Sequence, residues 1–206
     1  AIGLGSDADS SGSVAIGINA HAGNGTLSIG NSYAIGNGAN ASGLQAYAIG
    51  LNANASGFNT MALGTLANVS GTHSSAFGAY SRALANYSLA LGAYSSASAE
   101  SATAIGNRSS ASAINATAIG MLSNASARDS LAFGVNATTG SASGSASGLV
   151  AIGKNARAFV PGSGSGGGHA YALGENAIAS EDNAYAIGYN ATASAANAYA
   201  IGYKPM

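Results

Sequence analysis

The chain has 206 residues, enough for one globular domain, but it lacks Trp and Cys and contains only four Phe. So few large side chains cannot fill a compact core, and the lack of Cys excludes disulfides and thiol chemistry. Charged residues make up 6% of the chain and hydrophobic residues 47%, with a formal net charge of −1. This balance argues against a disordered segment, and six Lys and Arg are too few for a nucleic-acid surface.

One tripeptide, Ala followed by Ile, Leu or Phe and then Gly, recurs along the whole chain. Its glycines are Gly3, Gly17, Gly36, Gly50, Gly64, Gly78, Gly92, Gly106, Gly120, Gly134, Gly153, Gly174, Gly188 and Gly202. The eight from Gly36 to Gly134 are spaced at fourteen residues without exception. A short fixed period indicates stacked similar units, so we expect an all-β solenoid of about fourteen coils.

Within each repeat, positions are numbered here from the motif glycine as zero. Position −2 is always Ala, position +3 is Ala or Ser in every repeat before the last, and position +5 is nearly always Ala. Small residues at alternate positions follow the period of a strand with one buried face. We therefore expect two short strands per coil, joined by turns at the Asn-rich positions +2 and +9. Frequent glycine argues against a helix.

The large residue at position −1 is expected to point away from the small inner face. Its copies would form one apolar stripe, made of Ile2, Ile16, Ile35, Ile49, Leu63, Phe77, Leu91, Ile105, Ile119, Phe133, Ile152, Leu173, Ile187 and Ile201. Such a stripe is larger than the apolar patch that a soluble monomer normally exposes, so it predicts self-association. In the alternative arrangement the −1 residues point inward and Ala faces water, which leaves a monomer.

Three insertions break the period, near residues 24–30, 140–148 and 160–168. They lengthen the spacing to nineteen, nineteen and twenty-one residues, and each begins after about position +5. Insertions on one face of a solenoid are often binding loops, so Asn24, Ser143 and Ser165 mark possible ligand contacts. The glycine- and serine-rich stretch 162–168 is equally consistent with a solvated bulge.

Signals for catalysis or metal binding are weak. His21, His73 and His169 lie in different repeats, the seven acids are scattered, and no HExxH, GxSxG or phosphate-binding loop occurs. The stretch Asp7–Gly12 is similar to the opening of a calcium loop, but the acid expected at its twelfth position is Ile18. We therefore expect a non-enzymatic protein without catalytic, metal or cofactor residues.

The ends of the chain lie inside the repeat pattern, at Ala1–Gly3 and after Gly202. We therefore interpret residues 1–206 as a single repeat domain that is a fragment of a longer protein. No apolar run reaches the length needed to cross a bilayer, so direct membrane insertion of this segment is not expected.

The repeats resemble a known family. The stretches 197–202 and 46–50, and the sequence Asn-Ala-Asn-Ala-Ser-Gly at 52–57, are similar to head repeats of trimeric autotransporter adhesins such as the Yersinia adhesin. The resemblance covers essentially the whole chain. It implies left-handed parallel β-rolls, packed as a parallel homotrimer with the apolar stripe as the trimer interface. It also implies an extracellular position at the cell surface, held by an outer-membrane anchor outside this fragment. A neck or coiled-coil stalk is not recognisable after Gly202.

The function that follows is adhesion of a cell to an extracellular matrix protein or a host-surface glycan. Similar repeats occur in phage and virus fibres, so a virion attachment fibre is the alternative. A further alternative is an ice-binding solenoid, which would carry regular Thr ranks on an exposed face. The nine threonines fall irregularly, and only Thr103 and Thr117 are neighbours fourteen residues apart.

Overall fold

The computed structural model describes residues 1–25, 30–142, 146–161 and 168–203. The chain forms two compact units, Ala1–Ser101 and Ala102–Met206, called here the N-terminal unit and the C-terminal unit. Each unit is built from short parallel strands, and the described residues contain no helix. The all-β solenoid expected from the repeat is therefore confirmed.

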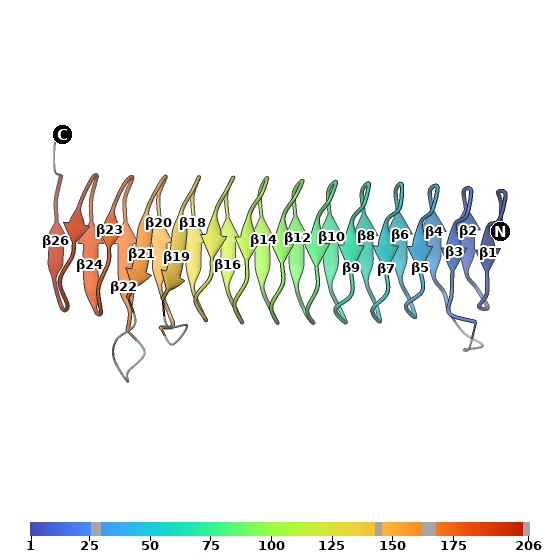
Figure 1. The fold of residues 1–206 in the computed structure, drawn as a ribbon, viewed down its shortest axis with the longest axis horizontal. Helices are drawn as coiled ribbons and strands as arrows, with labels where there is room; N and C mark the ends of the chain where they lie inside the picture. The colour runs from blue at the N-terminus through green and yellow to red at the C-terminus, as the bar shows by residue number, and fades with distance from the viewer. Residues whose placement is uncertain (26–29, 143–145, 162–167, 204–206) are drawn as a thin grey trace. The chain divides into compact units, whose positions relative to one another are not determined.

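In the N-terminal unit the even-numbered and odd-numbered strands form two separate parallel sheets, called the even sheet and the odd sheet (Figure 1). The even sheet consists of β2 (Val14–Ile16), β4 (Tyr33–Ile35), β6 (Tyr47–Ile49), β8 (Met61–Leu63), β10 (Ser75–Phe77) and β12 (Leu89–Leu91). The odd sheet consists of β1 (Asp7–Ala8), β3 (His21–Ala22), β5 (Asn40–Ala41), β7 (Asn54–Ala55), β9 (Asn68–Val69), β11 (Arg82–Ala83) and β13 (Ser96–Ala97).

The C-terminal unit repeats this arrangement. Its even sheet consists of β14 (Thr103–Ile105), β16 (Thr117–Ile119), β18 (Leu131–Phe133), β20 (Val150–Ile152), β22 (Ala170–Leu173), β24 (Ala184–Ile187) and β26 (Tyr199–Ile201). Its odd sheet consists of β15 (Ser110–Ala111), β17 (Asn124–Ala125), β19 (Thr138–Ser141), β21 (Arg157–Val160), β23 (Ile178–Ala179) and β25 (Thr192–Ala193). Thirteen of the fourteen motifs thus have a strand, while the first makes an isolated bridge from Ile2 to Ile16.

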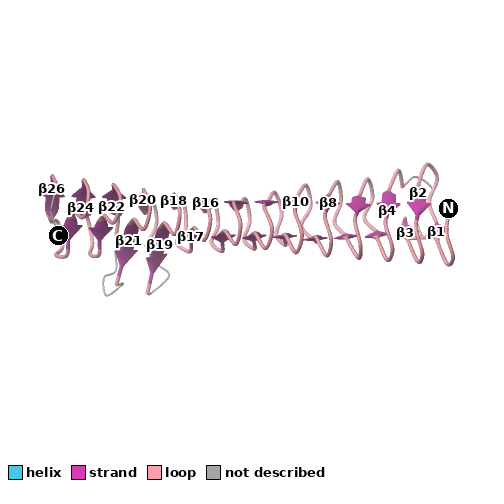
Figure 2. Ribbon diagram, turned by 90° about the horizontal axis from the view of Figure 1, so that it is seen from above, coloured by secondary structure: helices cyan, strands magenta, loops and turns pink. Residues whose placement is uncertain are grey.

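Each coil stacks on the next in the register set by the sequence period. Ala34 pairs with Ala48 and Ala48 with Ala62, so every motif residue lies beside its own copy. Seen from above, the two sheets of each unit form two layers that face each other (Figure 2). Small side chains fill the space between the layers. The described Ala residues at position −2, from Ala15 to Ala186, are completely buried. The Ala and Ser residues at position +3, from Ala20 to Ala177, are at most 1% exposed.

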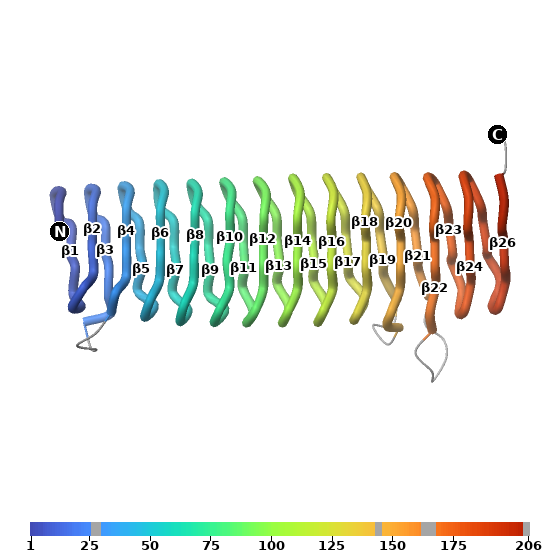
Figure 3. The backbone as a smooth tube through the Cα atoms, turned by 180° about the vertical axis from the view of Figure 1, so that it is seen from behind, coloured from blue at the N-terminus to red at the C-terminus, as the bar shows by residue number. Residues whose placement is uncertain are grey.

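Two turns close each coil, and both contain a residue with positive φ (Figure 3). The first turn places position +2 at φ between 51° and 60° where that residue is not Gly, and the second places position +9 in the same region. Asn tolerates this left-handed conformation better than most residues, which confirms the turns expected at its repeated positions. The buried Ser residues at position +3 of four coils add a hydrogen bond to the motif glycine carbonyl, for example Ser81 Oγ to Gly78 O at 2.8 Å.

All three insertions occur at the second turn, between an odd strand and the next even strand: β3 and β4, β19 and β20, and β21 and β22. Around the second and third insertions β19 and β21 extend to four residues and pair over their full length. Leu149 then occupies an interior position that holds Ala, Ser or Thr in other coils, and it is completely buried.

Candidate functional site

The position −1 side chains lie on the outer face of the even sheet. In the N-terminal unit Ile35 is 37% exposed and Ile49 is 39% exposed, although both follow a completely buried Ala. In the C-terminal unit Phe133 and Ile187 are exposed, while Ile105, Ile119 and Leu173 are half-buried. The alternation along a strand explains this placement, because successive side chains point to opposite faces. The alternative with Ala at the surface is therefore wrong.

Within each unit these residues stand in register as a continuous stripe, because Ile35 pairs with Ile49 and Ile49 with Leu63. Tyr rings at position −3 widen the stripe. Tyr33 stacks on Tyr47 with ring centroids 5.0 Å apart, and Tyr185 stacks on Tyr199 at 4.7 Å. The outer face of the even sheet is thus a large, nearly uncharged apolar surface in both units.

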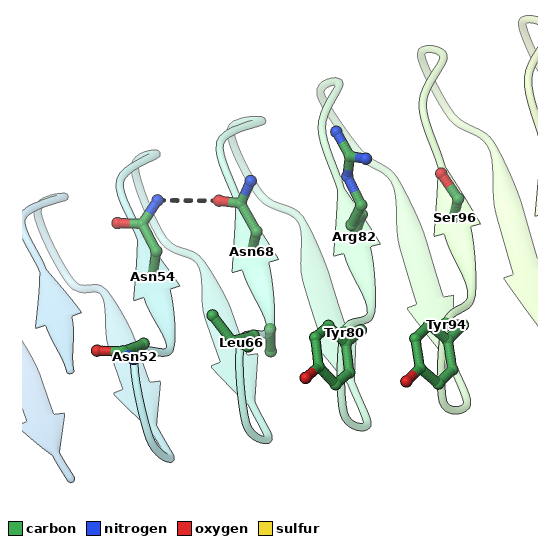
Figure 4. Close-up of a pocket in the computed structure, with 9 residues that line it drawn as sticks. Asn52, Asn54, Leu66, Asn68, Tyr80, Arg82, Tyr94 and Ser96 are labelled. Atoms are coloured by element: carbon green, nitrogen blue, oxygen red, sulfur yellow. Dashed lines mark hydrogen bonds between the residues drawn. The ribbon is translucent and has the colours of Figure 1, made fainter. Parts of the chain in front are cut away.

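A groove lies on the opposite side of the N-terminal unit, between the outer face of the odd sheet and the first turns (Figure 4). Its volume is about 680 Å³. The groove is lined by position +4 of strands β7, β9, β11 and β13 and by position +2 of the neighbouring turns. These residues are Asn54, Asn68, Arg82 and Ser96, together with Asn52, Leu66, Tyr80 and Tyr94.

The polar wall of the groove begins with a ladder of amides. Asn40 Nδ2 donates to Asn54 Oδ1 at 3.0 Å, and Asn54 Nδ2 donates to Asn68 Oδ1 at 2.9 Å. At one end, the ladder leaves Asn40 Oδ1 buried and without a hydrogen-bond partner in the described part of the chain. At the other end Asn68 Nδ2 has no acceptor among the described residues. The next residue in this column is Arg82, whose guanidinium is exposed and has no ion pair within the described ranges.

The apolar wall consists of large side chains at a turn position where Asn is usual. Leu66, Tyr80 and Tyr94 have φ of 57°, 59° and 58°. Such a conformation costs a non-glycine residue about 1–2 kcal/mol, and Asn bears it more readily than Leu or Tyr. All three are exposed, and the Tyr80 and Tyr94 rings stack with centroids 4.8 Å apart and planes within 3°. This wall therefore presents apolar surface at some cost in backbone strain.

Two carboxylates and one imidazole, from Asp7, Asp9 and His21, lie together at the start of the N-terminal unit and are called here the acidic cluster. Asp7 pairs in register with His21 because both occupy position +4, and Asp9 lies on the same face as Asp7. The carboxylate oxygens and a His21 nitrogen lie within 4.8 Å of one another, and His21 Nδ1 is 3.8 Å from Asp9 Oδ2. A hydrogen bond with Asp7 raises the pKa of Asp9, with smaller contributions from burial and from the charge of Asp7, while His21 opposes the shift. These are ligand types for a divalent cation.

The other histidines do not converge on this cluster. His73 stacks on Tyr87 with centroids 5.6 Å apart and contacts Asn59 through Nδ1 at 3.0 Å. His169 Nδ1 lies 2.9 Å from the Ser147 carbonyl. Of the residues proposed as loop contacts, Asn24 is described and exposed, whereas Ser143 and Ser165 lie outside the described residues.

The groove and the acidic cluster were not predicted from the sequence. The signal that reveals both is the fourteen-residue offset, which places Asp7 beside His21 and Asn54, Asn68, Arg82 and Ser96 in one column. A search for local motifs misses such columns because their members are far apart along the chain. Among the described residues, no helix is long and apolar enough to cross a membrane.

Comparison with known proteins identifies the repeat. The family model described as "YadA head domain repeat (2 copies)" matches residues 30–53, 41–67, 55–81, 70–95, 97–123, 165–184 and 179–204. Among solved structures, the collagen-binding domain of the Yersinia adhesin YadA is 22% identical, with a TM-score of 0.30, and the alignment covers 97% of this chain and 71% of that one. The comparison with curated proteins gave no match.

Proposed function

The chain belongs to the family of YadA head domain repeats, found in the heads of trimeric autotransporter adhesins, and from this membership we propose that it is a non-enzymatic adhesive head segment that works as a parallel homotrimer. The observation that carries the proposal is the exposed, in-register stripe on the even sheet. Soluble monomers rarely leave a continuous apolar surface of this kind in water.

Burial of the stripe offers a sizeable free energy of association. Full burial of an Ile or Leu side chain stabilises by about 1.5–3 kcal/mol, and more than a third of Ile35 is still exposed. Each stripe residue therefore has about 0.5–1 kcal/mol left to gain. A parallel three-fold arrangement brings every position −1 next to its own copies, so all coils contribute in the same register.

The proposed target is an extracellular matrix protein or a host-surface glycan. Family membership supports an extracellular position at the cell surface, and we propose that an outer-membrane anchor outside this chain holds it there. The Yersinia structure is named as a collagen-binding domain, which makes collagen a first candidate matrix partner for this chain. Three identical copies multiply weak contacts, so attachment gains from avidity.

The test uses the double variant Ile35→Asp, Ile49→Asp, which places two charges in the stripe. Its control, Ser98→Asp with Ser112→Asp, adds the same charge at exposed positions outside the stripe. We expect the stripe variant to lose trimer mass and attachment to immobilised collagen, fibronectin and glycans, while the control keeps both. A stripe variant that stays trimeric and adhesive would overturn the proposal.

A second part of the proposal concerns the edge that bears the insertions at 24–30, 140–148 and 160–168. Trimming all three to fourteen-residue spacing should preserve folding and reduce attachment to the surface that the intact chain binds. If the trimmed protein attached equally well, binding would belong to the regular faces of the coils. Activity in an ice-recrystallisation assay would instead favour the ice-binding alternative.

A further inference from the structure

We propose that the groove on the N-terminal unit is a binding site for an acidic saccharide, a pyranose carrying a carboxylate or sulfate group. The proposal rests on the adhesive function and names the ligand class that this groove would take. Its volume of about 680 Å³ falls within the range of ligand sites. Its two walls differ in chemistry, one made of hydrogen-bond donors and the other of aromatic and aliphatic side chains (Figure 4).

The donor wall selects a negative charge. The amide ladder runs in one direction, so the Nδ2 of its last member, Asn68, which lines the groove, has no acceptor among the described residues. Hydrogen bonds in a chain polarise one another, which strengthens the donor at the end. Arg82 follows Asn68 in the column and adds a guanidinium that has no ion pair among the described residues, and its fork matches carboxylate or sulfate oxygens. Two adjacent strands thus offer donors to one anionic group.

The apolar wall suits the faces of a sugar ring. Tyr80 is 44% exposed and Tyr94 is 51% exposed, and their parallel rings with Leu66 form a broad surface beside the donors. Pyranose rings carry patches of C–H groups that pack on aromatic rings, while their hydroxyls need polar partners such as the Asn amides and Ser96.

A peptide is a weaker fit. Extended peptides commonly bind by adding a strand to a free sheet edge, where unpaired backbone groups supply the hydrogen bonds. The groove instead lies on the face of the odd sheet, where β9 and β11 pair with strands on both sides. Recognition must therefore come from side chains, and a ligand rich in hydroxyl and anionic groups uses them best.

The test measures binding of the intact protein to three defined probes built on one scaffold: sialylated lactose, which carries only a carboxylate, sulfated lactose, which carries only a sulfate, and neutral lactose. We expect binding to one or both acidic probes, weakening as salt rises, and little binding to lactose. The two acidic arms distinguish a carboxylate ligand from a sulfate ligand. Equal binding to all three, or binding to none, would overturn the proposal.

Variants locate the site. Arg82→Gln should weaken acidic-saccharide binding about tenfold or more, because it removes charge-assisted hydrogen bonds. Its control is Arg157→Gln, at the same position +4 of an odd strand in the C-terminal unit, and it should leave binding unchanged. Tyr80→Asn restores the usual turn residue, so it should keep the fold by circular dichroism and still weaken binding. Equal losses in Arg82→Gln and Arg157→Gln would show non-specific charge attraction and overturn the site.

Two further outcomes separate this proposal from the adhesive function. If an acidic peptide of matched charge competed as well as the saccharide, the ligand class would be wrong. If Arg82→Gln bound matrix proteins normally and no acidic saccharide bound the unmodified trimer, the groove proposal would fail while adhesion stood. If the stripe variant lost all attachment to matrix proteins while each chain still bound the acidic saccharide, the result would support both the adhesive trimer and the saccharide groove.

Discussion

The motif glycine is expected to be irreplaceable, and Gly64→Ala tests this. Gly64 has φ of 139°, and an added Cβ would lie 2.5 Å from the Gly78 carbonyl oxygen of the next coil. The backbone strain costs about 1–3 kcal/mol, and forcing an extra carbon against a fixed backbone costs about the same again. We therefore expect Gly64→Ala to lower the free energy of unfolding by about 4 kcal/mol per chain.

The matched control is Gly25→Ala. Gly25 also has positive φ, at 67°, but among the described residues its added Cβ would meet only Asp9 Oδ2 at 3.7 Å, an ordinary contact. Its cost should be limited to the left-handed backbone, about 1–2 kcal/mol. Guanidinium unfolding of both variants at one fixed chain concentration gives the comparison. Equal losses would refute the explanation that close stacking of coils demands glycine at position zero.

Two further predictions concern the acidic cluster and the interior. The pKa of Asp9 should lie above its usual value in a carboxyl NMR titration and fall in Asp7→Ala, because the main cause of the shift is the hydrogen bond with Asp7. Because the pKa of Asp9 is raised in the folded state, protonated Asp9 favours folding at low pH, and this stability is lost as pH rises through the folded pKa. An unshifted pKa of Asp9 in the unmodified protein would contradict the prediction. Leu149→Ala should cost about 2–4 kcal/mol in chemical denaturation because Leu149 is completely buried, whereas half-buried Leu131→Ala should cost less. A larger loss at Leu131 would mean that the extended strands β19 and β21 do not define the core there.

The sequence was sufficient to predict the coil, the register and the inner face. In a stack with a constant period every residue lies beside its own copy, so the pairing of Ala34 with Ala48 follows from their spacing alone. The small size of the interior explains why Ala occupies position −2 and why Ile35 and Ile49 point outward. The Asn-rich turns were predictable because Asn accepts positive φ.

The groove could not be predicted in the same way. Its column at position +4 is readable from the spacing, but its apolar wall requires Leu66, Tyr80 and Tyr94 in a conformation that local turn preferences disfavour. The direction of the amide ladder depends on side-chain packing that a period does not encode. The acidic cluster was accessible, since Asp7 and His21 are one period apart, but a local motif search does not compare such positions. The longer strands and the buried Leu149 accompany insertions, where the repeat rule no longer applies.

The central proposal is a parallel, in-register homotrimer closed by the stripe, and single cysteines test it most directly. The chain has no Cys, so Ile105→Cys supplies one thiol per chain at the stripe, and Ser96→Cys supplies one on the odd sheet. Treatment with a short bismaleimide should give covalently linked chains for Ile105→Cys and single chains for Ser96→Cys, because only the stripe brings a residue next to its own copy. Single chains for Ile105→Cys, or linked chains for Ser96→Cys alone, would contradict the account.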